Sequence, residues 1–251
     1  MKTTDFVIII FIIISLAFSQ IYSQDTLNTN VGESFYISVG AGVTTFSLKE
    51  VDDFYNDIIE TYRNIGFPLI IQRQNPGNIV FNFSIARDFS SDITGGLRFQ
   101  HTWTGSYALY SDAIGNLDVV SKIFIAKFDG FIGVNLADAE SNVQPAFEFI
   151  LGGLNFNYDL RQTAKVGEPV IQNSETKISF NDLIPSLEIL FCLKYKIGII
   201  GLTGMTGYRY AKTSEVHAYS YNDGILVDDG KLKLEVDLSG FNLLFGIELE
   251  L

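Results

Sequence analysis

The side chains that most often carry catalysis are scarce in this chain of 251 residues. It has two histidines, His101 and His217, and one cysteine, Cys192, which allows no internal disulfide. A nucleophilic site needs a histidine within reach of a hydroxyl or thiol and a carboxylate. His101 shares its face of an alternating segment with Trp103, and His217 has Ser220 nearby without an evident carboxylate partner. We therefore predict no catalytic residue, no metal site and no cofactor.

Isolated charged residues of both signs are the other side chains that could take part in chemistry. Each stands alone on the polar face of a segment in which polar and apolar residues alternate: Arg98, Lys127, Glu148, Glu188, Lys194, Arg209 and Glu248. Charges inside a narrow enclosed space must pair or meet water, because burying them alone is costly. Pairing of the two arginines and Lys194 with the three glutamates gives a structural plug. A gated pore for small solutes is the alternative.

Alternating segments of this kind would position the charges. Residues 93–109 place Phe99 and Trp103 on one face and Arg98 and Gln100 on the other, which is the period of a β-strand. We count eight such segments, at about 34–48, 78–89, 92–109, 117–134, 145–160, 185–196, 198–212 and 231–251. Several are longer than the roughly five or six residues usual for globular strands.

The alternation is not uniform along the chain. The apolar phase changes at Gly152-Gly153 and at Ser239-Gly240, and glycine inside a strand commonly marks a bulge. The segment 117–134 is the least regular, because Ile125 falls on the face that carries Lys127. We therefore expect bulges at the two glycine positions and one irregular strand.

Composition restricts the class of protein and its partners. Hydrophobic residues make up 47% of the chain and charged residues 18%, against roughly a quarter in an ordinary soluble domain. Disorder needs the opposite balance of low hydrophobicity and high net charge. The net charge of −12 argues against nucleic acid as a partner, because phosphate binding needs clustered lysine and arginine.

The N-terminus has the pattern of an export signal. Residues 7–18 are almost entirely apolar, a lysine precedes them, and small residues follow at Ser19 and Ser23. This order is typical of a secretory signal peptide. A transmembrane anchor is the alternative, but it needs about 20 apolar residues. We predict a signal peptide at 1–23 and one mature domain at 24–251.

The connections between segments alternate in length. Those at 89–92 and 196–198 are tight, and those at 49–77, 161–184 and 213–230 are long. Bacterial outer-membrane barrels have short turns on one side and long loops on the other. An even number of strands then puts both chain ends on the short-turn side, which is the periplasm.

The first long loop has the pattern of an amphipathic helix. Ser47 and Glu50 have the spacing of a capping box, and Val51, Tyr55 and Ile59 follow at helical spacing. We expect a helix of about 15 residues, which packs on the barrel rim or serves as a lid or partner-binding element.

The two strand faces differ in a way that indicates which one meets lipid. The polar face carries mostly small residues and few charges, which fits the narrow lumen of an eight-stranded barrel. The apolar face carries large aromatic residues near the expected strand ends, as in the interfacial girdles of membrane barrels. These girdle candidates are Trp103, Tyr107, Tyr158, Tyr208 and Tyr210 toward the long loops, and Phe89 and Tyr195 toward the short turns. A soluble secreted β-protein, with its apolar face buried, is the alternative.

The export signal, the eight alternating segments and the closing segment 236–241 together resemble the small outer-membrane β-barrel family with the OmpA/OmpX-type fold. More narrowly, the chain is similar to the outer membrane protein beta-barrel domain proteins common in Bacteroidota. In such families the last strand alternates apolar residues and usually ends in Phe, which the barrel-assembly machinery recognises; here the chain ends in Leu251. The resemblance covers essentially the whole mature chain and carries over no catalytic residues.

The fold we expect is an all-β, antiparallel up-and-down transmembrane barrel of eight strands, or ten if part of 66–73 or 165–180 also pairs. The resemblance implies a monomer integral to the outer membrane of a Gram-negative cell, in contact with membrane lipid and the barrel-assembly machinery. We expect a non-enzymatic structural or surface-binding role, with a side-chain-filled lumen and an unidentified surface ligand. A narrow porin-like channel for small or apolar solutes is the alternative.

Overall fold

The computed structural model describes residues 34–46, 48–73, 78–113, 115–137, 141–166, 172–222, 225–232 and 234–251. The segment 1–23, predicted to be a signal peptide, lies outside the described residues. The described residues contain a closed ring of eight antiparallel strands, because each strand pairs with the next and the last pairs with the first. In ring order these are β1 (Phe35–Thr44), β3 (Asn78–Asp88), β4 (Ile93–Ser111), β5 (Gly115–Asn135), β6 (Val143–Val166), β7 (Gln172–Ile197), β8 (Ile200–Tyr210) and β13 (Gly240–Glu250). The prediction of an eight-stranded up-and-down barrel is confirmed.

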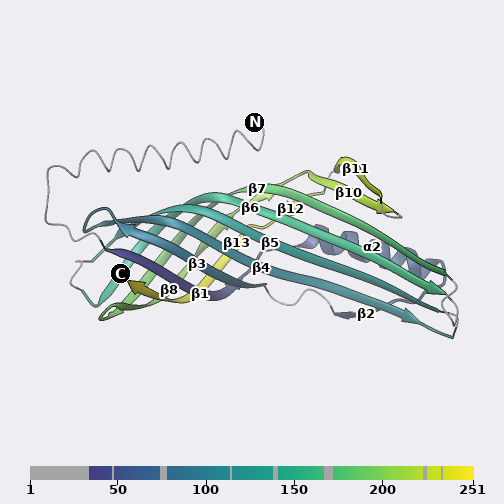
Figure 1. Ribbon diagram of the computed structural model, residues 1–251, viewed down its shortest axis with the longest axis horizontal. Helices are drawn as coiled ribbons and strands as arrows, with labels where there is room; N and C mark the ends of the chain where they lie inside the picture. The colour runs from purple at the N-terminus through teal and green to yellow at the C-terminus, as the bar shows by residue number, and fades with distance from the viewer. Residues whose placement is uncertain are drawn as a thin grey trace.

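Four neighbouring strands of the ring continue well beyond the barrel. β4, β5, β6 and β7 have 19, 21, 24 and 26 residues, whereas β1, β3, β8 and β13 have 10 or 11. The protruding parts of the four long strands form an open, curved sheet, which reaches away from the barrel in Figure 1. We call this sheet the extension.

Short strands widen the extension at both edges. β2 (Ile70–Arg73) pairs with β4 on one side. On the other side β10 (Val216–Asn222) pairs with β7, and β11 (Ile225–Leu232) pairs with β10. β9 (Lys212–Thr213) and β12 (Val236–Asp237) pair with each other. In the part of the chain that the structure describes, these strands stay outside the closed ring, so the ten-stranded alternative is wrong.

The helix α2 (Lys49–Asn64) lies against the inner face of the extension. Val51, Tyr55 and Ile59 are buried there, at helical spacing. The hydroxyl of Tyr55 donates a hydrogen bond to the carbonyl oxygen of Val119 on β5 at 3.1 Å. The predicted amphipathic helix is therefore confirmed, and its apolar face completes the core of the extension.

The start of α2 differs from the prediction. The N-cap residue is Leu48, which makes no side-chain cap hydrogen bond. Ser47, the expected capping residue, lies outside the described residues. Over the ranges that the structure describes, no helix has the length and hydrophobicity needed to cross a membrane.

Strand β6 turns its apolar side chains outward in the barrel and inward in the extension. Phe149 and Leu151 are exposed on the outside of the barrel, whereas Leu154 and Phe156 are fully buried in the core that includes α2. The pairing of β6 with β5 and β7 continues without a register shift through this point. The bulge predicted at Gly152-Gly153 is therefore wrong, because the apolar phase changes with the surroundings and not with the strand geometry.

The same inversion explains the irregular pattern of β5. Ile123 and Ile125 point to the same side as Lys127 and Asp129, and all four are buried. The two isoleucines belong to the apolar core under α2, and the two charged residues lie inside the barrel. One strand face therefore forms both the core of the extension and the lining of the lumen.

At Ser239-Gly240 the chain changes strand as well as face. β12 ends at Asp237, and β13 begins at Gly240. Leu238 is buried in the core of the extension, while Phe241 is exposed on the outside of the barrel. The change of phase is real, but the bulge expected here is wrong, because the chain breaks between two strands at this point.

Candidate functional site in the barrel lumen

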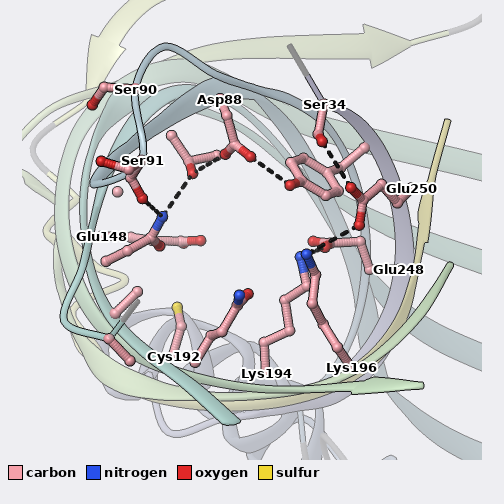
Figure 2. Close-up of a pocket in the computed structure, with 17 residues that line it drawn as sticks. Ser34, Asp88, Ser90, Ser91, Glu148, Cys192, Lys194, Lys196, Glu248 and Glu250 are labelled. Carbon is pink, nitrogen blue, oxygen red and sulfur yellow. Dashed lines mark hydrogen bonds and ion pairs between the residues drawn. The ribbon is translucent and has the colours of Figure 1, made fainter. Parts of the chain in front are cut away.

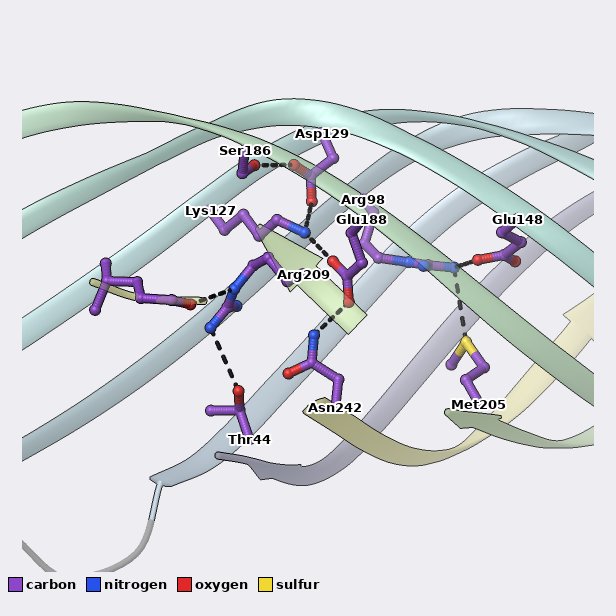
Figure 3. Close-up of polar contacts among 11 residues, drawn as sticks. Thr44, Arg98, Lys127, Asp129, Glu148, Ser186, Glu188, Met205, Arg209 and Asn242 are labelled. Atoms are coloured by element: carbon purple, nitrogen blue, oxygen red, sulfur yellow. Dashed lines mark hydrogen bonds and ion pairs between the residues drawn. The ribbon is translucent and has the colours of Figure 1, made fainter. Parts of the chain in front are cut away.

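The centre of the barrel holds a group of buried polar side chains, which we call the charge knot: Lys127, Asp129, Glu188, Arg209 and Asn242. Figure 3 shows Lys127 between two carboxylates. Its ammonium nitrogen lies 2.8 Å from Asp129 and is also paired with Glu188. The amide nitrogen of Asn242 donates a hydrogen bond to the other oxygen of Glu188. The side chains of the lysine and the two carboxylates are at most 1% exposed, so they depend on one another for charge compensation.

Strand register brings these side chains together. Lys127 and Asp129 are two residues apart on β5, so both point into the lumen. Glu188 on β7 lies directly opposite Arg209 on β8. The Nε of Arg209 donates a hydrogen bond to the carbonyl oxygen of Leu238 at 3.0 Å. The knot therefore connects strands from both sides of the ring to the segment that precedes β13.

A second ion pair lies beside the knot. Nη2 of Arg98 is 2.6 Å from Oε2 of Glu148, and its guanidinium lies over the ring of Phe131, 4.7 Å from the centroid. Counted together, the knot and this pair contain equal numbers of opposite charges: Arg98, Lys127 and Arg209 against Asp129, Glu148 and Glu188. This balance offsets the cost of taking each charge out of water.

Apolar side chains fill the space around these charges. One buried cluster includes Phe131, Ile150, Leu190, Met205 and Leu244, each at most 6% exposed. On the side of the extension, the apolar core under α2 follows. Over the described residues, the lumen is therefore filled at its centre.

The end of the barrel near the C-terminus contains a cavity of about 470 Å³, which we call the vestibule. Figure 2 looks into it, with the labelled side chains arranged around an open centre. Lys194 pairs with Glu248, and Lys196 pairs with Glu250 at 3.1 Å. Both lysines belong to β7 and both glutamates to β13, so each pair spans the intervening strand β8.

The seven charges predicted to face the lumen all lie inside the barrel. Arg98, Lys127, Glu148, Glu188 and Arg209 are at its centre, and Lys194 and Glu248 line the vestibule. Of the pairings considered from the sequence, those of Arg98 with Glu148 and of Lys194 with Glu248 occur. Glu188 instead takes Lys127 as its ion-pair partner.

Several lumen residues were not among the sequence candidates. Asp129, Lys196 and Glu250 each follow a candidate charge by two residues, so the period of a strand was enough to find them. Asn242 is neutral and stands on the polar face among small residues, and no signal in the sequence distinguishes it. Its role in the knot depends on the position of β13 beside Glu188.

The predicted aromatic girdle residues mostly lie on the outer surface. Trp103, Tyr195, Tyr208 and Tyr210 are 47–59% exposed, while Phe89 and Tyr107 are partly buried. The assignment of Tyr158 to the girdle is wrong. Tyr158 is fully buried, and its ring stacks on Phe180 with the centroids 5.5 Å apart. The reason is the inversion of β6, which turns its apolar face inward at this height.

The histidines and the cysteine lie apart from one another. The ring of His101 packs against Trp103 and Phe124 on the outside, with centroid distances of 5.1 and 4.3 Å. Cys192 is buried at the edge of the vestibule, and His217 is on β10 in the extension. Among the residues that the structure describes, no three His, Cys, Asp or Glu side chains are placed to hold a metal ion.

The outer surface changes character between barrel and extension. Every ring strand exposes large apolar side chains on the barrel, for example, in ring order, Val39, Phe81, Leu97, Phe128, Phe149, Leu193, Leu202 and Phe245. On the extension the outward positions of β6 are polar: Asn155, Asn157, Asp159 and Arg161. A water-soluble barrel would bury its apolar face, so the alternative of a soluble secreted β-protein does not fit this surface.

No known protein-family model matches this sequence, and no curated protein is detectably similar to it. Solved structures with a similar arrangement of strands include the following three. A major outer membrane protein from Thermus thermophilus is 11% identical, covers 88% of this chain and 100% of its own, and has a TM-score of 0.49. Neisserial surface protein A is 11% identical, with the same coverage and a TM-score of 0.38. Acinetobacter baumannii CarO2 is 13% identical over 86% of this chain and 99% of its own, with a TM-score of 0.32.

Proposed function

We propose that this chain is an integral outer-membrane barrel with a side-chain-filled lumen, whose role is structural or surface-binding and not enzymatic. The observation that carries the proposal is the apolar belt on the outside of a closed ring that keeps its charges inside. Contiguous apolar surface of this extent is rare on soluble monomers. A closed ring also pairs its backbone groups internally, which a structure inside a bilayer must do.

The height of the belt fits a bilayer. On β7 the outward apolar side chains run from Leu187 to Ile197. At about 3.3 Å per residue and a tilt of about 40°, these residues rise roughly 25 Å, the usual height of the apolar band of such barrels. Lipid is therefore the partner that we propose for this surface, and a ring closed within one chain supports a monomer.

The extension is the element that we propose faces the cell exterior. Its outward positions on β6 are polar, and it lies at the opposite end of the molecule from the C-terminus (Figure 1). Its far end exposes three large apolar side chains, Ile65, Phe67 and Ile70, next to the edge strand β2. This end offers a contact surface for a ligand outside the cell. The vestibule then opens toward the periplasm.

Protease protection tests the membrane placement. The mature chain, residues 24–251, is refolded into phospholipid vesicles and treated with a non-specific protease, and the protected fragments are identified by mass spectrometry. We expect protection of the barrel portions of the ring strands, including residues 187–197, and cleavage beyond them. Cleavage within 187–197 in protein whose unboiled gel band still shifts on heating would contradict the proposal.

A narrow channel is the second candidate function. The vestibule favours it, because the cavity reaches Glu148, which lies next to the charge knot. Single-channel recording of the refolded mature chain in planar bilayers separates the two candidates. A filled lumen should give no discrete current steps. Reproducible steps from protein with a heat-shifted gel band would establish the channel instead.

A further inference from the structure

The vestibule contains a carboxylate that has no ion-pair partner among the described residues. The ammonium groups of Lys194 and Lys196 are each paired with a glutamate of β13. The guanidinium of Arg98 is paired with Glu148. Asp88, at the end of β3, also lines the cavity, and among the described residues its carboxylate accepts hydrogen bonds from hydroxyl groups. The local excess of negative charge is therefore centred on this residue.

Two hydroxyl groups hold the Asp88 carboxylate in a fixed orientation. The hydroxyl of Tyr36 donates to Oδ2 at 2.5 Å, and that of Thr94 donates to Oδ1 at 2.5 Å. A carboxylate has about four lone-pair sites, so each oxygen keeps acceptor capacity for a further donor. Figure 2 shows Asp88 on the wall opposite Lys194, with the open centre of the cavity between them. A ligand in the cavity therefore meets an oriented acceptor.

The charges of the vestibule favour a cation over an anion. Four carboxylates line it, those of Asp88, Glu148, Glu248 and Glu250, and two ammonium groups, which leaves a net charge of −2. Arg98, which lies behind Glu148, reduces this to −1. A half-enclosed site with a net negative charge attracts cations more than anions.

The groups around Asp88 suit an ammonium better than a metal ion. An ammonium has three N–H donors, and the side chains of Ser90, Ser91 and Asn135 line the same cavity with further oxygen atoms. A divalent cation prefers several oxygen ligands with carboxylates among them. Within the described ranges, no set of three acidic or imidazole side chains is placed for one.

We propose that the vestibule is a binding site for a small hydrophilic solute that carries a primary ammonium group, and that Asp88 binds this group. The volume of about 470 Å³ lies within the usual range for small-molecule sites, about 300–1,000 Å³. Because binding is measured on the folded barrel in detergent, the proposal holds or fails independently of whether the lumen conducts or which way the barrel faces.

The test compares two compounds that differ in one group. Isothermal titration calorimetry is carried out near neutral pH on the refolded mature chain, with 5-amino-1-pentanol and with 1,5-pentanediol. We expect saturable binding of the amine and no heat from the diol. Asp88→Asn should lower the affinity for the amine at least tenfold. Asp92→Asn removes an exposed carboxylate from the neighbouring turn, outside the cavity, and should leave the affinity unchanged.

Several results overturn the proposal. Equal binding of the amine and the diol shows that the charge is not recognised. Equal binding of tetramethylammonium, which has no N–H donor, shows that only the electrostatic field acts. Displacement of the amine by millimolar Mg²⁺ assigns the site to a metal ion. If Asp88→Asn does not give a heat-shifted gel band, the comparison of these compounds on the unmodified chain decides.

Discussion

Leu151 and Leu154 lie three residues apart on β6 and face opposite surroundings. Leu151 is 41% exposed on the outside of the barrel, and Leu154 is fully buried in the core between the extension and α2. The strand pairing is continuous from one to the other. A single sheet therefore has two interiors of opposite polarity. The barrel encloses charges and exposes apolar side chains, and the extension encloses apolar side chains and exposes polar ones.

Truncation of these two leucines should have unequal effects. Leu154→Ala leaves a cavity in a packed core and should reduce stability by about 2–5 kcal/mol. Leu151→Ala should cost less, because lipid chains fill the space that the side chain leaves. Hydrogen–deuterium exchange in vesicles should show faster exchange of the extension in Leu154→Ala alone. Similar exchange in both variants would mean that the extension does not depend on this core.

The eight ring strands were predictable because alternation with period 2 persists whichever face is apolar. The lengths of the four long strands, β4 to β7, were not predictable from this alternation. The sequence predicts a loop at 161–184, yet β6 runs to Val166 and β7 starts at Gln172. Residues 172–177 are polar on both faces, so they carry no alternation from which a strand can be recognised. Their own sequence therefore does not predict the pairing with β6 that the structure shows.

The inward direction of the charges also follows from alternation, but their partners do not. Arg98 on β4 reaches Glu148 on β6, and Lys127 on β5 reaches Glu188 on β7, so both pairs skip a strand. Such contacts depend on how far neighbouring strands of the ring are shifted along one another. The residue pattern of a single strand does not reveal this shift. Tyr158 was wrongly assigned to the outer surface for a related reason. The alternation shows which residues share the apolar face, but not whether that face points outward or into a buried core.

Removal of the cation of Lys127 should destabilise the barrel strongly. Lys127→Met leaves Asp129 and Glu188 buried without their shared partner, a change that costs about 3–5 kcal/mol in comparable sites. The double variant Lys127→Met/Glu188→Gln returns the buried charges to balance, with two cations and two carboxylates, and should recover part of the loss. The midpoint of urea unfolding in vesicles measures both. A double variant less stable than Lys127→Met would refute charge balance as the explanation.

Alkaline pH should weaken the extension before the barrel. Burial raises the pKa of Tyr55, with a further contribution from Tyr107, and burial also raises the pKa of Tyr158. In the unfolded chain both phenols ionise near pH 10, while in the folded chain they stay neutral to higher pH. Their contribution to stability is therefore complete below about pH 10 and is lost as pH rises through the folded pKa.

Absorbance at 295 nm, which reports tyrosinate, should show a late fraction in the alkaline titration of the folded protein. Tyr55→Phe should reduce the amplitude of that fraction and make the extension less sensitive to pH, as seen by hydrogen exchange. Tyr210→Phe, which removes an exposed tyrosine, serves as the control. A late fraction of the same size in Tyr55→Phe would contradict the assignment.

Gly207 and Gly204 on β8 should differ sharply in their tolerance of a methyl group. A Cβ at Gly207 would lie 1.9 Å from the carbonyl oxygen of Ile189 on β7, so the two strands must separate to accept it. A Cβ at Gly204 would meet the ring of Phe245 at 3.8 Å, an ordinary contact. Gly207→Ala should therefore cost at least about 1–3 kcal/mol and lower the yield of the heat-shifted gel band after refolding, whereas Gly204→Ala should refold as the unmodified chain does. Equal yields would show that close approach of β7 and β8 at Gly207 is not needed to close the ring.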